Sequence, residues 1–536
     1  MSNTKNNIIL EEYENKFLYK KSKTNLNIEF NRIAFIFFVF LVISIIFSVQ
    51  LLHLGSLKKE NNIKSAPDIK NYRADIIDRN GNYLAKTVSS IDIGINPVEV
   101  IDKRKLLINL QLIFPKKNYL EISNKLDQNK FFYLEKKISV ENYEKIMLLG
   151  DKSIKPEEKL TRIYPQKNLF SHIIGQIDDD NQGISGLEKS FDDRLKQKKE
   201  PLRLTVDTDI QFLIRQQLIK FNSIFRSKGA AAILMNVNNG EIISMVSYPD
   251  FDLNKREEVV DLKFINRATK GVYELGSVFK TFTITAGLEQ NLIDVDTKFL
   301  DLPKAIWCAG KPIREYDNKM PASLTVEEIL IRSGNIGSVR IGQKLEINKL
   351  KLFLEKIGIL NKIDFDIEEV GEPIAFKWGK CKLATVSFGH GITTTPLQLA
   401  KGYSIISNGG FDVKPSLIKN DKYDNKAKKR IIKKGVSKKI NLILRKVVAT
   451  EEGTAGLADV VGYEVGGKTG TAESYTKKAK INTFASIFPT SKPKYTLIVL
   501  LDEPKTNSEY IYNYRDEKQP TKGTPFNTAG WTSVEV

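Results

Sequence analysis

The chain has 536 residues, of which 41% are hydrophobic and 27% are charged, so it can bury more than one core and is not a low-complexity protein. Its formal net charge of +19 favours contact with polyanions or with an anionic surface. Two cysteines and three histidines are too few for a disulfide framework, a zinc ribbon, an iron-sulfur cluster or a histidine-rich metal site built from this chain alone.

A long apolar segment follows a basic amino-terminal tail. From Ile33 to Leu57, 25 consecutive residues lack Asp, Glu, Lys and Arg, whereas about 20 apolar residues suffice to span a bilayer. A cleaved signal peptide would have a shorter apolar region and a small-residue cleavage site. We therefore interpret residues 33–54 as an uncleaved transmembrane anchor and residues 1–32 as a cytoplasmic tail, with a buried core helix as the alternative.

The region after the anchor begins with a predicted hairpin and continues with predicted helices. Strand-like stretches at 75–78 and 83–95 flank an Asn-Gly turn, which is typical of a tight hairpin. Residues 103–160 are rich in Lys, Glu and Leu with helical spacing, so we expect helices there.

The pattern changes near residue 205. Long helical stretches then alternate with short Val- and Ile-rich strands, such as those predicted at 230–237 and 241–247 around an Asn-Asn-Gly turn. We therefore place one domain at 60–204 and a second at 205–536.

Ser277 and Lys280 are the first pair whose types and spacing suggest catalysis. A helix-compatible run extends from Gly276 to Gln290, and a separation of three residues places both side chains on one helix face, about 5–6 Å apart at Cβ. The helix dipole and partial burial disfavour a protonated amine there, so Lys280 would act as a base toward a serine that is otherwise a poor nucleophile. The same spacing also arises by chance on solvated helix faces.

Two further groups follow in the chain. Ser333-x-Asn335 lies in a turn after the helical stretch 325–331, where a hydroxyl and an amide would face a cleft. A Lys-Thr-Gly-Thr run from Lys468 to Thr471 follows two glycines and suits a strand whose small residues let a substrate backbone approach closely. Each group alone is common in turns or strand ends, but the order Ser-x-x-Lys, Ser-x-Asn, Lys-Thr-Gly resembles the signature of the penicillin-recognising serine enzymes.

With these motifs the chain resembles a class B penicillin-binding protein, and most closely the septal peptidoglycan transpeptidase of cell division. The pedestal pattern of that family resembles residues 73–81, 162–165 and 183–188, and its later elements resemble residues 389–400. The implied fold is α/β of the α+β type. An antiparallel sheet flanked by helices would form the transpeptidase domain, after an elongated pedestal of the family's dimerisation type and one amino-terminal transmembrane helix.

The resemblance also implies a role for each motif residue. Ser277 would attack the penultimate D-Ala carbonyl of a donor stem peptide and form an acyl-enzyme, with Lys280 as its base. Ser333 would relay a proton to the leaving amine, and Asn335 would bind the donor amide. Lys468 would keep Lys280 neutral. In the substrate-binding run Thr469, Gly470 and Thr471, the two threonines would receive the donor carboxylate. The backbone N–H groups of Ser277 and Thr471 would form the oxyanion hole.

The implied surroundings are those of a cell-wall enzyme. We expect a single-pass protein of the bacterial inner membrane with its catalytic domain in the periplasm, acting on peptidoglycan stem peptides and acylated by β-lactams. No metal or cofactor is required. Glycan polymerisation would come from a membrane glycosyltransferase working with other division proteins. A basic stretch at 419–439 is interpreted as a solvated face, with an anionic lipid or glycan phosphate as the alternative, and we expect no nucleic-acid partner.

Other functions stay open on the sequence alone. They are an elongation-type class B transpeptidase, a D,D-carboxypeptidase or β-lactamase, and a non-catalytic β-lactam-binding division scaffold. His390 raises a Ser-His-Asp hydrolase as a rival, but no Gly-x-Ser-x-Gly elbow surrounds Ser277, so we interpret His390 as structural or cleft-lining.

Two expectations concern the cysteines and the carboxyl terminus. Cys308 and Cys381 would face an oxidising compartment, and we favour two free thiols over the possible disulfide. Residues 527–531 resemble the start of a final helix that covers one face of the catalytic sheet in class B enzymes, yet Trp531 is followed by only five residues. We therefore expect less cover over five apolar sheet positions, Ile481, Phe484, Ile487, Leu497 and Val499.

Overall fold

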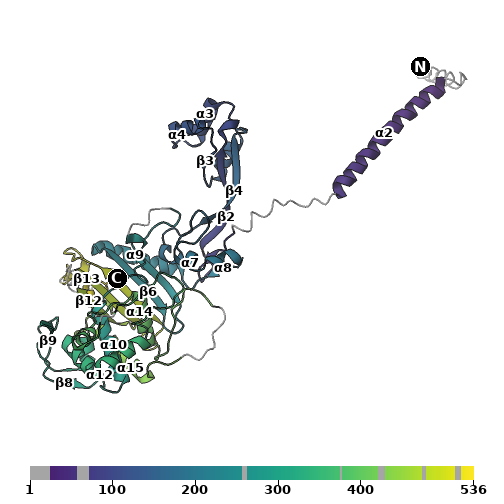
Figure 1. The fold of residues 1–536 in the computed structure, drawn as a ribbon. Helices are drawn as coiled ribbons and strands as arrows, with labels where there is room; N and C mark the ends of the chain where they lie inside the picture. Colours follow the sequence, from purple (N-terminus) through teal and green to yellow (C-terminus); the bar gives the residue numbers. More distant parts are fainter. Residues whose placement is uncertain are drawn as a thin grey trace, which may run out of the picture. The chain divides into compact units, whose positions relative to one another are not determined.

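The computed structural model describes residues 25–56, 72–255, 262–374, 377–420, 429–473, 479–512, 521–524 and 526–536. These residues belong to two compact units, residues 1–69 and residues 70–536. The first contains one long helix. The second is a mixed α/β assembly that holds both the expected pedestal and the expected catalytic domain (Figure 1).

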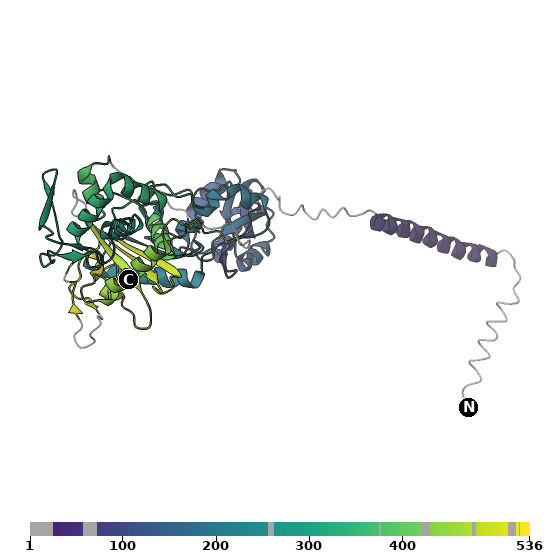
Figure 2. The same cartoon turned by 90° about the horizontal axis from the view of Figure 1, so that it is seen from below.

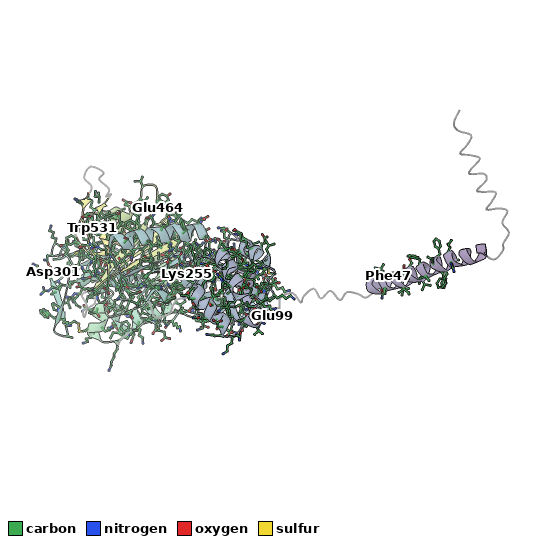
Figure 3. All side chains as sticks on the ribbon, turned by 90° about the horizontal axis from the view of Figure 1, so that it is seen from above. Phe47, Glu99, Lys255, Asp301, Glu464 and Trp531 are labelled. Atoms are coloured by element: carbon green, nitrogen blue, oxygen red, sulfur yellow. A yellow bond between two sulfur atoms is a disulfide. The ribbon has the colours of Figure 1, made fainter. Side chains whose placement is uncertain are left out.

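Helix α2 (Asn25–Ser56) is the described part of the first unit. Its segment Arg32–Leu52 is long and apolar enough to cross a membrane by length and composition. Apolar side chains, Phe47 among them, stand out from the helix all along this segment (Figure 3). A helix that is apolar all round needs an apolar environment, so the amino-terminal apolar helix is confirmed as a candidate anchor. Residues 1–24 of the expected tail lie outside the described residues.

The predicted hairpin is present at the start of the second unit. β1 (Ile76–Ile77) is shorter than expected, whereas β2 (Tyr83–Ile95) has the predicted bounds. The carboxylate of Asp78 accepts hydrogen bonds from the backbone N–H groups of Asn80 and Asn82, both at 2.8 Å. Gly81 has a φ of +93°, a conformation that this turn requires and that glycine adopts without strain.

The prediction of helices throughout 103–160 is wrong in part. Three helices are present, but β3 (Phe132–Glu135) and β4 (Ile154–Ile163) interrupt them. β4 pairs antiparallel with β2 over ten residues, from Lys86 opposite Ile163 to Ile95 opposite Ile154. Local propensity of the Lys- and Glu-rich sequence favours helix, but the ladder offered by β2 overrides it. The helices are α3 (Lys103–Ile113), α4 (Tyr119–Asp127) and α5 (Val140–Met147).

The pedestal segments noted in the sequence meet in one buried ion cluster. The Glu188 carboxylate bonds to Arg73 and, at 2.8 Å, to Nε of Arg162, and all three side chains are buried. Arg73 also pairs with Asp192 at 2.7 Å. A buried carboxylate held by two guanidinium groups is compensated for its lost hydration, so the cluster ties the segment before β1 to β4 and to α7 (Gly186–Ser190).

Five antiparallel strands form the larger sheet, in the order β12–β13–β14–β6–β7. The two strands predicted around the Asn-Asn-Gly turn are β6 and β7, each displaced by one residue from its expected bounds. α9 (Thr208–Ile224) packs on one face, and α14 (Pro396–Ser407) and α15 (Lys434–Ala449) on the other (Figures 1 and 2). The strand bounds are Gly466–Glu473 (β12), Lys480–Phe488 (β13), Tyr495–Asp502 (β14), Gly229–Asn236 (β6) and Ile242–Tyr248 (β7).

Helix α10 (Phe279–Glu289) lies at the centre of the main core. Ten consecutive residues from Phe279 to Leu288 are buried, so this helix has no solvent-facing stripe. α12 (Asn335–Lys356), α11 (Val326–Ile331) and α15 contact it. The first residues of α10 are therefore held rigidly. The second unit also contains the hairpin β9–β10 (Ala305–Cys308, Lys311–Arg314), the pair β8–β11 (Lys298–Phe299, Leu324–Thr325), the pair β15–β16 (Ile511–Tyr512, Thr521–Lys522) and α13 (Lys380–Val386). Its shorter elements are α6 (Ser171–Ile174), α8 (Asp192–Gln197) and β5 (Leu202–Arg203).

The expectation of reduced cover over the sheet is wrong for three of its five positions. Phe484, Ile487 and Val499 are buried, and the other two are half-buried. The register of β13 and β14 places Leu497 and Val499 on the face opposite to Ile481 and Ile487. Leu497 packs against the cluster that contains α9, Tyr512 and Trp531, in which the Tyr512 and Trp531 rings lie 5.1 Å apart in an edge-on contact. Ile487 belongs to the main core instead, and Ile481 packs against that core.

The interpretation of two free thiols is also wrong. Cys308 at the end of β9 and Cys381 at the start of α13 form a disulfide, with their Cα atoms 5.4 Å apart. Both residues are half-buried. Sequence separation gave no hint of this pairing, because only the packing of α13 beside the β9–β10 hairpin brings the two residues together.

We expect the disulfide to contribute measurably to stability. It closes a loop of 73 residues, for which chain entropy predicts a contribution of about 4 kcal/mol. The double variant Cys308→Ser, Cys381→Ser should melt several degrees below the wild-type protein. A reducing agent should lower the melting temperature of the wild-type protein and leave that of the double variant unchanged. Equal melting temperatures for the oxidised and reduced wild-type protein would contradict this prediction.

Candidate active site

Three elements present the predicted site residues. Ser277 lies in the 3-10 turn η4 (Gly276–Val278) that leads into α10, and Lys280 is the second residue of α10. Ser333 ends the turn after α11 in a left-handed conformation, with φ of +61°, and Asn335 begins α12. Lys468, Thr469, Gly470 and Thr471 lie on the edge strand β12.

The hydroxyl of Ser333 lies between two buried amines. Nζ of Lys280 donates to Oγ of Ser333 at 3.1 Å and to its carbonyl oxygen at 2.5 Å. Nζ of Lys468 donates to the same Oγ at 2.9 Å. Nζ of Lys280 also donates to Oδ1 of Asn335 at 2.7 Å. The structure therefore brings the three motifs into one hydrogen-bonded cluster.

The electrostatics of the cluster favour neutral amines. Burial lowers the pKa of Lys280 to about 7, and the nearby carboxylate of Glu315 acts in the opposite direction. Burial, followed by repulsion from Lys280, lowers the pKa of Lys468 well below its ordinary value. A lysine with a pKa near 7 has a substantial neutral fraction at physiological pH and can accept a proton.

The turn around Ser277 and strand β12 are in close backbone contact. Gly276 has a φ of +63°, and a Cβ atom there would lie 2.6 Å from the carbonyl oxygen of Thr471. A Cβ on Gly470 would likewise collide with the carbonyl oxygen of Leu275. Glycine is required at both positions, because only a backbone without side chains lets η4 and β12 approach so closely.

The two predicted threonines are not equivalent. Oγ1 of Thr469 lies 2.6 Å from Oγ1 of Thr454 and 3.3 Å from Nζ of Lys468. Oγ1 of Thr471 accepts a hydrogen bond from the backbone N–H of Ala529 at 2.9 Å. The hydroxyl of Thr469 is therefore the one ordered beside the amine of Lys468.

His390 lies beside this region and pairs with another residue. Its Nδ1 is 3.5 Å from the carboxylate of Glu274, and its ring packs against Phe388. The other carboxylate oxygen of Glu274 accepts from the backbone N–H of Gly391 at 3.0 Å. Lys280, and not His390, is thus the basic group that bonds within the three-motif cluster.

Two site residues were missed by the sequence reasoning. Glu315 accepts from the backbone N–H of Asn335, and Thr454 contacts Thr469. The first lies after a hairpin well upstream of the Ser-x-Asn motif, and the second lies in the loop before β12. Glu315 belongs to no local pattern. Thr454 lies in the run 453–455, which resembles the division form of the family, but the run gives no sign of its contact with Thr469.

Comparison with protein families identifies the class of this protein. The family model "Penicillin binding protein transpeptidase domain" matches residues 230–518, which is more than half of the chain. "Penicillin-binding Protein dimerisation domain" matches residues 68–217. The chain belongs to the penicillin-binding protein transpeptidases, and its combination of the two domains is that of class B.

Among individual relatives the chain is similar to proteins of the septal type. It is 29% identical to the "Probable peptidoglycan D,D-transpeptidase FtsI" of Caulobacter vibrioides, over 88% of this chain and 80% of the relative. It is 28% identical to the "Peptidoglycan D,D-transpeptidase FtsI" of Buchnera aphidicola, over 89% and 90%. It is also 31% identical to "Stage V sporulation protein D" of Bacillus subtilis, over 85% and 78%.

Proposed function

We propose that this protein is a peptidoglycan D,D-transpeptidase that cross-links stem peptides during septal cell-wall synthesis through an acyl-enzyme on Ser277. The observation that carries this proposal is the hydroxyl of Ser333 held between the amines of Lys280 and Lys468, at 3.1 and 2.9 Å. Such an arrangement can pass a proton from the nucleophile's side of the site toward a leaving amine. Relatives named as peptidoglycan D,D-transpeptidases support the reaction class.

The proposed reaction has two acyl transfers. Lys280 takes the proton of Ser277 while Oγ attacks the penultimate D-Ala carbonyl of the donor, and the backbone N–H groups of Ser277 and Thr471 stabilise the oxyanion. Each such donor contributes on the order of 3 kcal/mol. Ser333 passes a proton to the departing D-Ala amine, while Asn335 binds the donor amide. The amine of a second stem peptide then attacks the acyl-enzyme: the new amide forms as the ester bond to Ser277 breaks, and the proton of the amine passes through Lys280 to Oγ of Ser277.

The surroundings of this reaction are part of the proposal. The family and the apolar helix fit a membrane-anchored periplasmic enzyme. We place helix α2 in the bacterial inner membrane, with the amino terminus in the cytoplasm. Residues 60–204 serve as pedestal and residues 205–536 as the catalytic domain. A membrane glycosyltransferase and other division proteins would supply and organise the glycan strands.

A partition experiment tests the proposed reaction. The full chain in detergent micelles is mixed with a donor that ends in D-Ala-D-Ala and with increasing concentrations of an amine acceptor. We expect the aminolysis product to rise with acceptor concentration, because the acyl-enzyme transfers to an amine. Hydrolysis alone would identify a D,D-carboxypeptidase, and a stable acyl-enzyme without turnover would identify a scaffold; either result would overturn the proposal.

Thr469→Val should weaken recognition of the donor carboxylate. The hydroxyl of Thr469 is ordered beside the amine of Lys468, and losing a hydrogen bond to a charged group costs roughly 1.5 to 3 kcal/mol. We expect KM for the donor to rise with little change in kcat. Thr161→Val, the same change in β4 of the pedestal, is the matched control. A fall in kcat at unchanged KM would show that the hydroxyl acts in the transition state instead.

A further inference from the structure

The segment after hairpin β9–β10 reaches the start of helix α12. Oε2 of Glu315 accepts from the backbone N–H of Asn335 at 2.6 Å, and Oε1 accepts from that of Ile336 at 2.8 Å. The N-cap residue of this helix is Gly334, which has no side chain to satisfy these donors. A carboxylate from another part of the chain therefore caps α12, where free N–H groups and the helix dipole both favour an anion.

The same segment fixes the side-chain amide of Asn335. Nδ2 of Asn335 donates to the carbonyl oxygen of Arg314 at 2.8 Å, while Oδ1 accepts from Nζ of Lys280 at 2.7 Å. With its nitrogen held on one side, the amide presents only its oxygen to the amine. Glu315 and Arg314 thus determine where Asn335 lies and how its amide is turned.

Glu315 also bears on the charge of the site. Lys280 and Lys468 are both fully buried and share the hydroxyl of Ser333. The carboxylate of Glu315 raises the pKa of Lys280 against the effect of burial, whereas repulsion from Lys280 adds to the burial that lowers the pKa of Lys468. A half-buried carboxylate at this position offsets part of the repulsion between the two amines.

We propose that Glu315 is a positioning residue for acylation: by capping α12 it holds Asn335, and through Asn335 the amine of Lys280, in the arrangement that the reaction needs. This role rests on the proposed function of Ser277 and Lys280. The hairpin β9–β10 then helps to place Glu315, because β10 ends at Arg314, directly before it. The disulfide of Cys308 with Cys381 attaches the turn end of the hairpin to α13.

The test compares three variants of the full chain in detergent micelles, using the rate of acylation by a fluorescent penicillin as a function of pH. Glu315→Gln removes the charge, and one of the two backbone donors then faces an amide N–H group. We expect acylation about 10- to 100-fold slower, the range for a lost charge-assisted hydrogen bond. The acid limb of the profile should move to lower pH, because the carboxylate no longer favours protonated Lys280.

Glu315→Asp separates position from charge. The shorter side chain keeps the charge but cannot reach both N–H groups, so the rate should fall while the acid limb stays near its wild-type position. Asp317→Asn is the matched control, because Asp317 is exposed and its carboxylate accepts from the backbone N–H of Lys319. We expect wild-type rates and an unchanged profile for this variant.

Two results would overturn the inference. One is a wild-type rate and pH profile in Glu315→Gln. The other is a rate loss in both Glu315 variants that follows only the unfolded fraction measured by thermal melting, with the profile of the folded protein unchanged. Peptide mapping of the labelled wild-type protein distinguishes failure of the proposed function from failure of this inference. Label on a peptide without residue 277 would refute the proposed function. Label on Ser277, together with wild-type rates in the Glu315 variants, would refute only this inference.

Discussion

Ser277→Ala is expected to abolish acylation by a β-lactam. The alanine variant lacks the hydroxyl that forms the proposed ester, and Lys280 and Ser333 are hydrogen-bonded to each other in the buried cluster. The side chain of Ser277 is half-buried, so its removal should change the free energy of unfolding by no more than about 0.5 kcal/mol. Intact-mass spectrometry after penicillin treatment, with thermal melting of the same sample, measures both effects.

A matched serine variant controls for this result. Ser223→Ala changes an exposed residue of α9, on the other side of the sheet from α10, and should be labelled like the wild-type protein. Label that persists in Ser277→Ala, or that maps to a peptide without residue 277, would refute the assignment of the nucleophile.

Lys280→Met should slow acylation by about 10²- to 10⁴-fold, the usual contribution of a general base. Methionine keeps an unbranched side chain in the buried position but cannot accept a proton. Because burial lowers the pKa of Lys280 to about 7, the neutral amine predominates above that pH, and the wild-type rate should rise as the pH increases through about 7. The variant should lose this rise. Stopped-flow acylation across this pH range measures the effect.

Lys356→Met is the matched control for the lysine. This residue is exposed at the end of α12, and its loss should leave both the rate and the pH profile unchanged. An unchanged acylation rate in Lys280→Met would refute the base role. A slower rate that keeps the wild-type rise near pH 7 would assign the titration to another group, for which Lys468 is the nearest candidate in the cluster.

Local signals sufficed for several strands of this protein. The strand-like stretch 83–95 and the Asn-Gly turn before it are both local signals, and β2 has the predicted bounds. β6 and β7 are displaced by only one residue for the same reason, because Asn-Asn-Gly determines the turn between them. β4 was missed because its Lys- and Glu-rich sequence has no strand pattern of its own. Its conformation comes from the ladder with β2, which lies far away in the chain.

The candidate site divides in the same way. Three short motifs in a fixed order predicted one group of site residues: Ser277, Lys280, Ser333, Asn335 and Lys468. This was possible because each motif is a short local run, and its residue types alone indicate the chemistry that it could perform. The folded chain alone decided that the hydroxyl of Ser333 lies between two amines, since α10, the turn before α12 and strand β12 meet only in the core.

The sequence by itself therefore determined the family and the apolar helix, and it predicted the motif residues and their chemical roles. Tertiary structure decided the cap of α12 by Glu315, the contact of Thr454 with Thr469 and the disulfide of Cys308 with Cys381. The physical reason is the range of the interactions. Turns, helix faces and short sequence motifs depend on residues a few positions apart. The helix cap, the contact between the two threonine hydroxyls and the disulfide depend instead on which distant segments the core brings within hydrogen-bonding or bonding distance.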